Sequence, residues 1–225
     1  TAGTYTYYAS ATKTLNSIIK NSNVRSVSVT VVDAPTIGAI TAPSNVFANS
    51  AFTMSWSGTD VVNYKIRGNV VASGVSTTDV DLGTTPSRSI TPTAAGTYTY
   101  TITATNAAGV TSTSTRVVTV EADPTFTGFT VNGSASISVA PSAALTFAGA
   151  GFSTGAVLQG RNSGNTASAV LPTTASASVG STTYYAAAIK TLNSLERVST
   201  LRSVTVAVVA NPTVGAITAP TNVFS

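Results

Sequence analysis

The stretch Gly96-Thr-Tyr-Thr-Tyr-Thr-Ile-Thr-Ala-Thr105 alternates apolar residues with threonine. Because successive side chains of a β-strand point to opposite faces of a sheet, this alternation predicts a strand with one buried face and one face covered by hydroxyl groups. Phe52-Thr-Met-Ser-Trp56 has the same alternation. We expect these two strands to face each other across a core that contains Trp56 and Tyr98.

The sequence also repeats itself. Residues 13–47 recur as residues 190–224, with 23 of the 35 aligned positions identical. A more divergent copy lies between them, because the proline junctions at Pro35, Pro124 and Pro212 are spaced by 89 and 88 residues. Each repeat has the length typical of one β-sandwich domain. Neighbouring repeats differ and alternate repeats nearly match, which indicates the order B-A-B-A.

These repeats predict four regions. Residues 1–33 are expected to be the C-terminal strands of a B-type domain, and residues 34–122 a complete A-type domain. Residues 123–211 are expected to be a complete B-type domain, and residues 212–225 the first strand of a further A-type domain. Both ends would then fall inside domains. Because orphan strands leave sheet edges unpaired, we expect the chain to be a segment of a longer polypeptide.

Three stretches of the A-type repeat carry a family resemblance: Phe52–Gly58, Ile90–Gly109 and Val117–Val120. They resemble the bacterial immunoglobulin-like and PKD-like repeat families. The resemblance implies an all-β fold of tandem immunoglobulin-like β-sandwich domains with about seven strands each. Such families occur in large bacterial surface proteins and in phage virion proteins, mostly as spacers or adhesive modules.

The resemblance also implies two details of the core. Gly96-Thr-Tyr98 is similar to a tyrosine corner, in which the phenol bonds back to nearby backbone. Tyr5 and Tyr184 are its expected counterparts in the B-type repeats. Phe147 is expected to take the place of Trp56 in the B-type core.

Composition argues against several classes of function. With no His and no Cys among 225 residues, the commonest acid-base, nucleophilic and metal-binding side chains are missing, so we expect no enzyme activity and no cofactor. The eleven Lys and Arg residues are scattered and leave a net charge of only +4, which argues against a nucleic-acid partner. The segment has no apolar run near the roughly 18 to 20 residues of a membrane span.

Four acidic residues form two candidate pairs. Asp79 and Asp81 would share one strand face and are either a calcium or acid-base pair or the charges of a protected edge strand. Glu121 and Asp123 lie at a domain junction, where they either clamp calcium or belong to a solvated linker. The linker is favoured because the other junctions do not repeat the pair.

Two further motifs have competing interpretations. Lys13, Lys65 or Lys190 could form an internal isopeptide bond with Asn, but that reaction needs a buried carboxylate, and none recurs at a fixed spacing. Asn132-Gly-Ser134 fits an N-glycosylation sequon, while Asn-Gly is also a strong hairpin-turn signal. The turn is favoured.

Both B-type repeats carry apolar residues in a long connection, at residues 13–19 and 190–197. These residues either cap their own core, pack on the next domain or form a contact surface. The candidate contact residues are Leu15, Ile18, Ile19, Leu192 and Leu195.

The sequence therefore favours a structural or adhesive segment of a semi-rigid extracellular rod or fibre at the bacterial cell surface or in a filament. Its partners would be neighbouring domains of the same chain, identical chains in a fibre, or a surface receptor or glycan. The alternatives are a phage virion appendage and a carbohydrate- or receptor-binding module. Sugar binding would use Tyr7, Tyr8 and the pair Tyr184-Tyr185, but one ring of each pair is expected to point inward.

Overall fold

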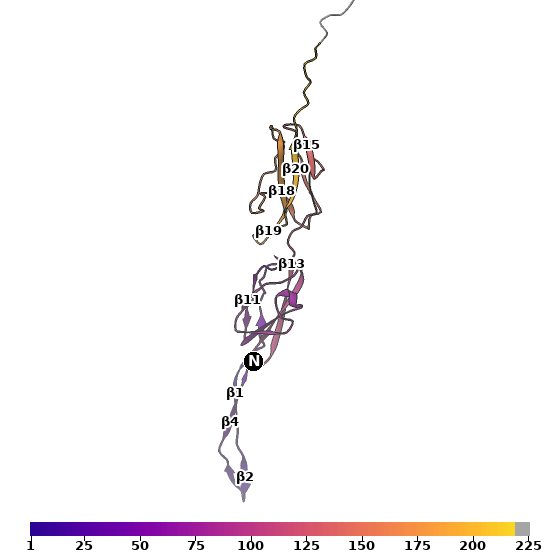
Figure 1. Ribbon diagram of the computed structural model, residues 1–225. Coiled ribbons are helices and arrows are strands. Elements are labelled where there is room, and N and C mark those ends of the chain that lie inside the picture. The colour runs from indigo at the N-terminus through magenta and orange to yellow at the C-terminus, as the bar shows by residue number, and fades with distance from the viewer. Residues whose placement is uncertain (219–225) are drawn as a thin grey trace, which may run out of the picture. The chain divides into compact units, whose positions relative to one another are not determined.

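Figure 1 shows the computed structural model, which describes residues 1–218. Apart from one short 3-10 turn, Val71–Ser73, the regular structure of these residues is entirely β-strand, which confirms the predicted all-β class. The chain divides into two compact units, Thr1–Ala122 and Asp123–Ser225. The strand predicted within residues 212–225 is not formed by residues 212–218, and residues 219–225 lie outside the described part.

The first unit contains a β-sandwich. Its larger sheet has the strand order β10-β9-β12-β13-β6. These strands are β6 (Asn45–Phe47), β9 (Asn63–Gly68), β10 (Val80–Gly83), β12 (Gly96–Thr105) and β13 (Thr111–Glu121). The remaining pairs join β7 (Phe52–Ser55) to β11 (Ser87–Ile90) and β5 (Thr36–Ile37) to β8 (Gly58–Thr59). β13 pairs antiparallel with β12 and parallel with β6, as the last strand of an immunoglobulin-like sandwich does.

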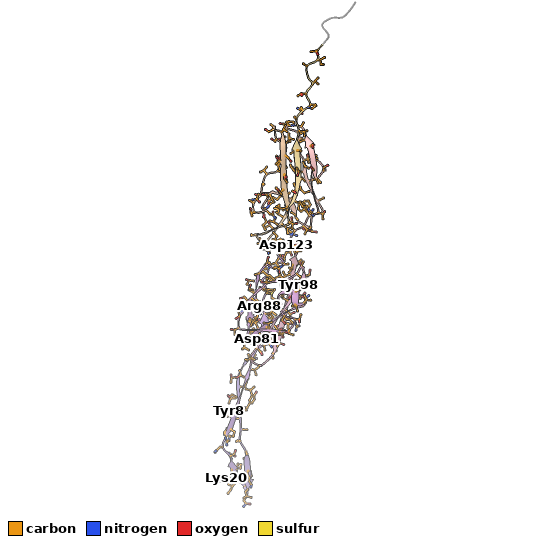
Figure 2. All side chains as sticks on the ribbon, in the orientation of Figure 1. Tyr8, Lys20, Asp81, Arg88, Tyr98 and Asp123 are labelled. Atoms are coloured by element: carbon orange, nitrogen blue, oxygen red, sulfur yellow. The ribbon has the colours of Figure 1, made fainter. Side chains whose placement is uncertain are left out.

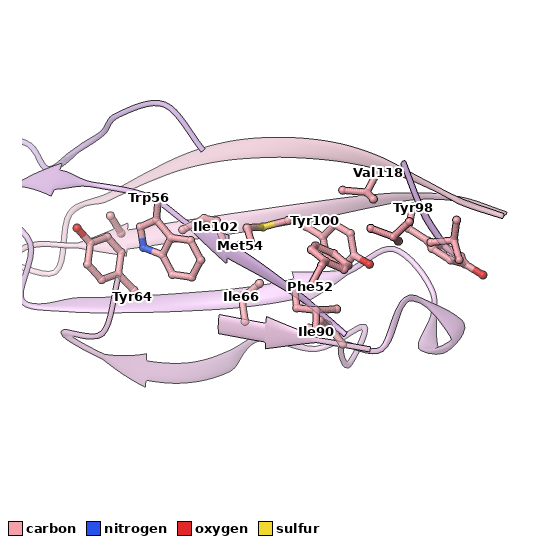
Figure 3. Packing of buried hydrophobic residues seen from close by; sticks show 14 residues of the cluster. Phe52, Met54, Trp56, Tyr64, Ile66, Ile90, Tyr98, Tyr100, Ile102 and Val118 are labelled. Carbon is pink, nitrogen blue, oxygen red and sulfur yellow. The ribbon is translucent and has the colours of Figure 1, made fainter. Parts of the chain in front are cut away.

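The core of this sandwich lies where the two alternating stretches meet (Figure 3). Phe52 of β7 packs edge to face on Tyr100 of β12, with ring centroids 6.0 Å apart. Trp56 is buried and packs in the same manner on Tyr64, at 5.9 Å. Met54, which lies between Phe52 and Trp56 in the sequence, is fully buried. The period-two pattern therefore places large apolar groups on one face, as predicted.

The second unit has a related sandwich with different side chains. Its larger sheet has the order β15-β20-β18-β17, with β19 paired to β18, and its smaller sheet pairs β14 with β16. The strands are β14 (Gly128–Val131), β15 (Ser136–Val139), β16 (Phe147–Ala150), β17 (Val157–Arg161), β18 (Gly180–Leu192), β19 (Leu195–Val198) and β20 (Arg202–Val208). As in the first unit, the last strand, β20, pairs parallel with an early strand, β15.

Residues 1–33 form a ribbon that precedes the sandwich of the first unit in sequence. β1 (Gly3–Ala9) pairs with β4 (Arg25–Val31), and β2 (Thr12–Leu15) pairs with β3 (Ile18–Asn21). Each pair is a two-stranded sheet. Every residue of these four strands is exposed.

The tyrosine corner is present in two places. The Tyr98 hydroxyl donates to the Ala94 carbonyl oxygen at 2.9 Å, and the Tyr5 hydroxyl donates to the Thr1 carbonyl oxygen at the same distance. The prediction for Tyr184 is wrong. Counted from the glycine that begins its strand, Tyr184 occupies the position of Tyr100, and its ring packs on Phe147 with centroids 5.2 Å apart.

Candidate contact surfaces

The two apolar connections of the B-type repeats are regular β-hairpins rather than loops. β2 and β3 are joined by Asn16 and Ser17, and β18 and β19 by Asn193 and Ser194. All four residues have positive φ, at 44° and 63° in the first turn and 48° and 65° in the second. Two consecutive left-handed residues are characteristic of type I′ turns, whose twist matches that of paired strands.

The tip of the first hairpin exposes large apolar side chains. Leu15, Ile18 and Ile19 are 66%, 60% and 63% exposed. A shallow cavity of about 320 Å³ lies at this tip, and its walls are Lys13, Leu15, Asn16, Ile18 and Lys20. Two predicted contact residues, Leu15 and Ile18, therefore lie together with two cations, whereas Ile19 pairs with Thr14 on the opposite face.

The tip of the second hairpin is more polar. Leu192 is half-buried and Leu195 is exposed. Glu196 stands where the first hairpin has Ile19, and its carboxylate lies 3.7 Å from the guanidinium of Arg161. The two tips thus share a turn but differ in chemistry, which argues against one common ligand.

The acidic residues of the predicted calcium sites have separate partners; Figure 2 labels one residue of each pair, Asp81 and Asp123. Asp79 lies 3.7 Å from Arg67. Asp81, on the edge strand β10, accepts hydrogen bonds at 2.9 Å from the Asn63 amide and from the Gly83 backbone N–H. These hydrogen bonds, that of Asn63 above all, lower the pKa of Asp81 below its usual 3.8. The pair therefore has the surroundings of a charged sheet edge.

The junction acids are also separated in their contacts. Asp123 lies 3.7 Å from Arg197 in the second unit. Glu121 ends β13 and accepts a long hydrogen bond of 3.5 Å from the Asn45 amide. Within residues 1–218, no three acidic side chains come together in a way that would hold a metal ion.

The remaining motifs occupy defined places. Asn132 and Gly133 form a two-residue turn with φ of 47° and 80°. The Thr146 N–H donates a hydrogen bond to the side-chain oxygen of Asn132 at 2.7 Å. Lys190 donates to the Thr154 carbonyl oxygen at 2.7 Å. Lys65 lies opposite Asp81 in the sheet. The isopeptide hypothesis stays a prediction.

A second cavity, which sequence reasoning missed, lies in the second unit. It has a volume of about 280 Å³, and its walls are Arg161, Asn162, Ser163, Ala169, Val170, Leu171, Thr182, Thr183, Tyr184 and Tyr185. Arg161 is buried, and its guanidinium donates to the Gln159 amide oxygen at 2.7 Å and to the Asn165 carbonyl oxygen at 2.9 Å. Its charge is thereby held beside the half-buried Tyr185, its cross-strand partner, whereas the Tyr184 ring packs on Phe147.

The tyrosines of the ribbon behave differently from the prediction. Tyr7 and Tyr8 are 60% and 72% exposed, so both rings face solvent; Figure 2 labels Tyr8. The expectation that one would point inward is wrong because both faces of the ribbon are open. Since the two rings lie on opposite faces, they still do not form one platform.

Within residues 1–218, no helix has the length and apolar character that crossing a membrane requires.

The fold and its strand pairing define the class of this protein, an all-β chain of immunoglobulin-like sandwiches. No family model and no curated protein sequence matches the chain. Among solved structures it is similar to the fibronectin(III)-like modules of Clostridium thermocellum CbhA, with 17% identity, a TM-score of 0.35 and coverage of 78% of this chain and 94% of that one. It is also similar to a protein of Corynebacterium diphtheriae described as membrane-anchored, with 15% identity, a TM-score of 0.30 and coverage of 96% and 70%.

Proposed function

We propose that the chain is a structural repeat segment whose immunoglobulin-like domains form a semi-rigid extracellular rod or fibre. The observation that carries this proposal is the shortness of the junction between the two units. β13 of the first unit continues to Glu121, whose carbonyl oxygen accepts a hydrogen bond of 2.8 Å from the Ala48 N–H. The first unit thus holds its backbone up to Glu121.

In the second unit, contacts with the rest of that unit begin at Asp123. Asp123 pairs with Arg197 at 3.7 Å, Pro124 is fully buried, and the Thr125 N–H donates to the Ser153 hydroxyl at 3.0 Å. Ala122 alone lies between the two anchored segments. Because a linker this short, followed by proline, permits few backbone conformations, it restricts rotation between domains.

Measuring the freedom of the junction tests the rod. Spin labels at Thr77→Cys and Ser178→Cys, both exposed positions in a chain without natural cysteine, report distances between the units. We expect a narrow distance distribution in the full chain and a broad one after a Gly-Ser insertion behind Ala122. The same insertion in the turn at residues 107–109 is the control and leaves the distribution narrow. A broad distribution without any insertion contradicts the proposal.

The rod would serve as a stalk or filament at a bacterial surface, with a phage appendage as the alternative origin. Imaging of the native assembly separates them, because a stalk projects singly from cells and an appendage belongs to a particle. In either setting we propose that this segment is non-catalytic.

A second candidate function is recognition of a glycan or receptor in the second unit. The observation that favours it is the cavity beside Arg161, where polar side chains lie next to Tyr185, the cross-strand partner of Arg161. Glycan-array binding of the full chain tests it. We expect Tyr185→Ala to abolish any signal and Tyr8→Ala, on the ribbon, to leave it unchanged. Equal loss in both variants, or no signal at all, contradicts recognition at this cavity.

A further inference from the structure

The β1–β4 ribbon has one apolar and one hydroxyl face. Cross-strand partners share a face, so Tyr5 lies beside Val29, and Tyr7 beside Val27. On the other face, hydroxyl groups pair across the strands, for example Thr6 with Ser28 at 2.9 Å. The apolar face is exposed, with Val27 at 60% and Val29 at 47%. A sheet with this pattern normally buries its apolar face.

The same ribbon exists in a buried state within the chain. β18 and β20 repeat its register, because Tyr184 faces Val204 as Tyr7 faces Val27. Val204 and its neighbour Val206 are each only 1% exposed. The two ribbons therefore share pairing and sequence, and they differ in what covers them.

The segments that connect the paired strands, residues 10–24 and 187–201, contain the same hydrogen bonds. The Ala11 N–H donates to the Ser22 hydroxyl at 2.8 Å, and the Ala188 N–H donates to the Ser199 hydroxyl at 2.9 Å. Each serine hydroxyl in turn donates to the next residue's carbonyl oxygen at 3.0 Å. The exposed ribbon is thus preformed in the conformation that the sandwich uses.

In the second unit, residues of the segment 126–175 cover the ribbon. Phe129 and Val131 belong to the same core cluster as Val204 and Val206. β15 pairs with the free edge of β20, and β17 pairs with the free edge of β18. Arg202 donates to the Phe126 carbonyl oxygen at 3.1 Å. These contacts involve one face, both edges and one cation of the ribbon.

We propose that the apolar face and both edges of residues 1–33 are the binding surface for a segment with the sequence pattern of residues 123–177, supplied by the same polypeptide ahead of the ribbon. The two parts then close a further B-type sandwich. Arg25 takes the place of Arg202 as the anchor of the bound segment. This inference does not depend on whether the array forms a rod.

A second copy of the chain does not fit this surface as well. Residues 123–177 of a second copy are already covered by that copy's own β18 and β20. Exchanging ribbons between copies would therefore expose one apolar face for each face it covers. Because the exchange buries no additional apolar area, it provides no driving force.

The test is a fusion that places a copy of residues 123–177 directly before Thr1 of the full chain, followed by hydrogen exchange. The informative amides are those of Ser28 and Val32. Their counterparts, Thr205 and Val209, donate to β15 or the residue before it, at 3.2 Å to Ala135 and 2.9 Å to Val139. We expect exchange at Ser28 and Val32 to slow by on the order of 100-fold in the fusion. Unchanged exchange at both amides overturns the proposal.

Two variants of the fusion make the result specific. Val29→Asp places a charge on the apolar face and is expected to remove the new protection while residues 202–208 keep theirs. Thr30→Asp, on the hydroxyl face of the same strand, is the matched control and keeps the protection. Protection that survives Val29→Asp overturns the proposal. So does a plain chain that sediments as a dimer with Ser28 and Val32 already protected, since its occupant would be a second copy.

Discussion

The cores of the two sandwiches are built from different side chains around a similar strand pairing. In the first unit, Met54, Trp56 and Tyr100 fill the space between the sheets, and Tyr100 uses its hydroxyl inside the core. In the second unit, β18 contributes Ala186 and Ala188, and four phenylalanines from two other strands and their flanking loops supply volume: Phe126, Phe129, Phe147 and Phe152. The same strand pairing therefore accommodates a core whose large side chains lie on the long central strand and a core in which that strand carries alanines. Four substitution experiments, from the largest expected effect to the smallest, test the assignments in the two units.

The largest expected effect comes from removing a buried side chain from the core of the first unit. Met54 is fully buried, so Met54→Ala should destabilise the first unit by about 2–5 kcal/mol through lost contacts and an unfilled cavity. The single tryptophan, Trp56, lies in the same unit, so its fluorescence during denaturation reports that unit alone. Thr53→Ala, on the exposed face of the same strand, should change stability by less than about 0.5 kcal/mol. Equal effects of the two substitutions would contradict the assigned faces.

The second effect is a loss of stability at high pH in the first unit. Burial, with a smaller contribution from Tyr98, raises the pKa of Tyr100 to about 12. Between pH 10 and 12 the unfolded phenol ionises while the folded one stays protonated, so stability falls by up to about 1.4 kcal/mol per pH unit. Below pH 10 this group adds no pH dependence.

Tyr100→Phe distinguishes this titration from general alkaline unfolding. The variant loses the hydrogen bond of 2.7 Å to the Ser73 carbonyl oxygen and with it about 1 kcal/mol at neutral pH. Its stability should then decline less steeply between pH 10 and 12 than that of the parent, as followed by Trp56 fluorescence. Parallel pH curves for the two proteins would exclude Tyr100 as the source.

The third effect transfers the tyrosine corner from one B-type repeat to the other. Thr182 occupies the position that Tyr5 holds in the ribbon, and it is exposed. Thr182→Tyr should add a hydrogen bond to the Ser178 carbonyl oxygen and stabilise the second unit by about 0.5–1.5 kcal/mol. Thr182→Phe, measured by hydrogen exchange in β20, separates the hydroxyl from the ring. A gain that is the same for Phe and Tyr argues against a corner.

The smallest effect concerns Asp81 on the sheet edge. Because its folded pKa lies below the usual 3.8, its contribution is present above about pH 4 and is lost as pH falls through the lowered pKa. Asp81→Asn should therefore flatten the acid limb of the stability curve slightly. Asp79→Asn, which removes an exposed pair with Arg67, serves as the comparison. A steeper acid limb in Asp81→Asn would contradict this assignment.

Several features of the fold could be read from local sequence. Alternation around Met54 and Tyr100 predicted the two core strands, because period two is a property of every extended chain. Asn132-Gly133 predicted its turn, since both residues tolerate left-handed backbone. The hairpin tips at Asn16 and Asn193 were missed, although Asn-Ser between alternating residues was an available signal.

The candidate surfaces were predicted less well. The buried guanidinium of Arg161 gave no local signal, because its acceptors on Gln159 and Asn165 are set by the path of the following loop. Tyr184 was assigned to the wrong position, since a tyrosine near the start of a strand satisfies the corner pattern at either of two positions of the same face. Counting from Gly180 separates them.

For this protein, the sequence by itself determines the core strands and the Asn132-Gly133 turn, because these depend on the conformations that neighbouring residues favour. Only the tertiary structure decides whether an apolar face is covered. Val29 and Val206 have equivalent places in nearly the same local sequence, yet one is 47% exposed and the other 1%. The difference arises because burial requires a partner surface, and residues of the segment 126–175 supply it to one ribbon and not to the other.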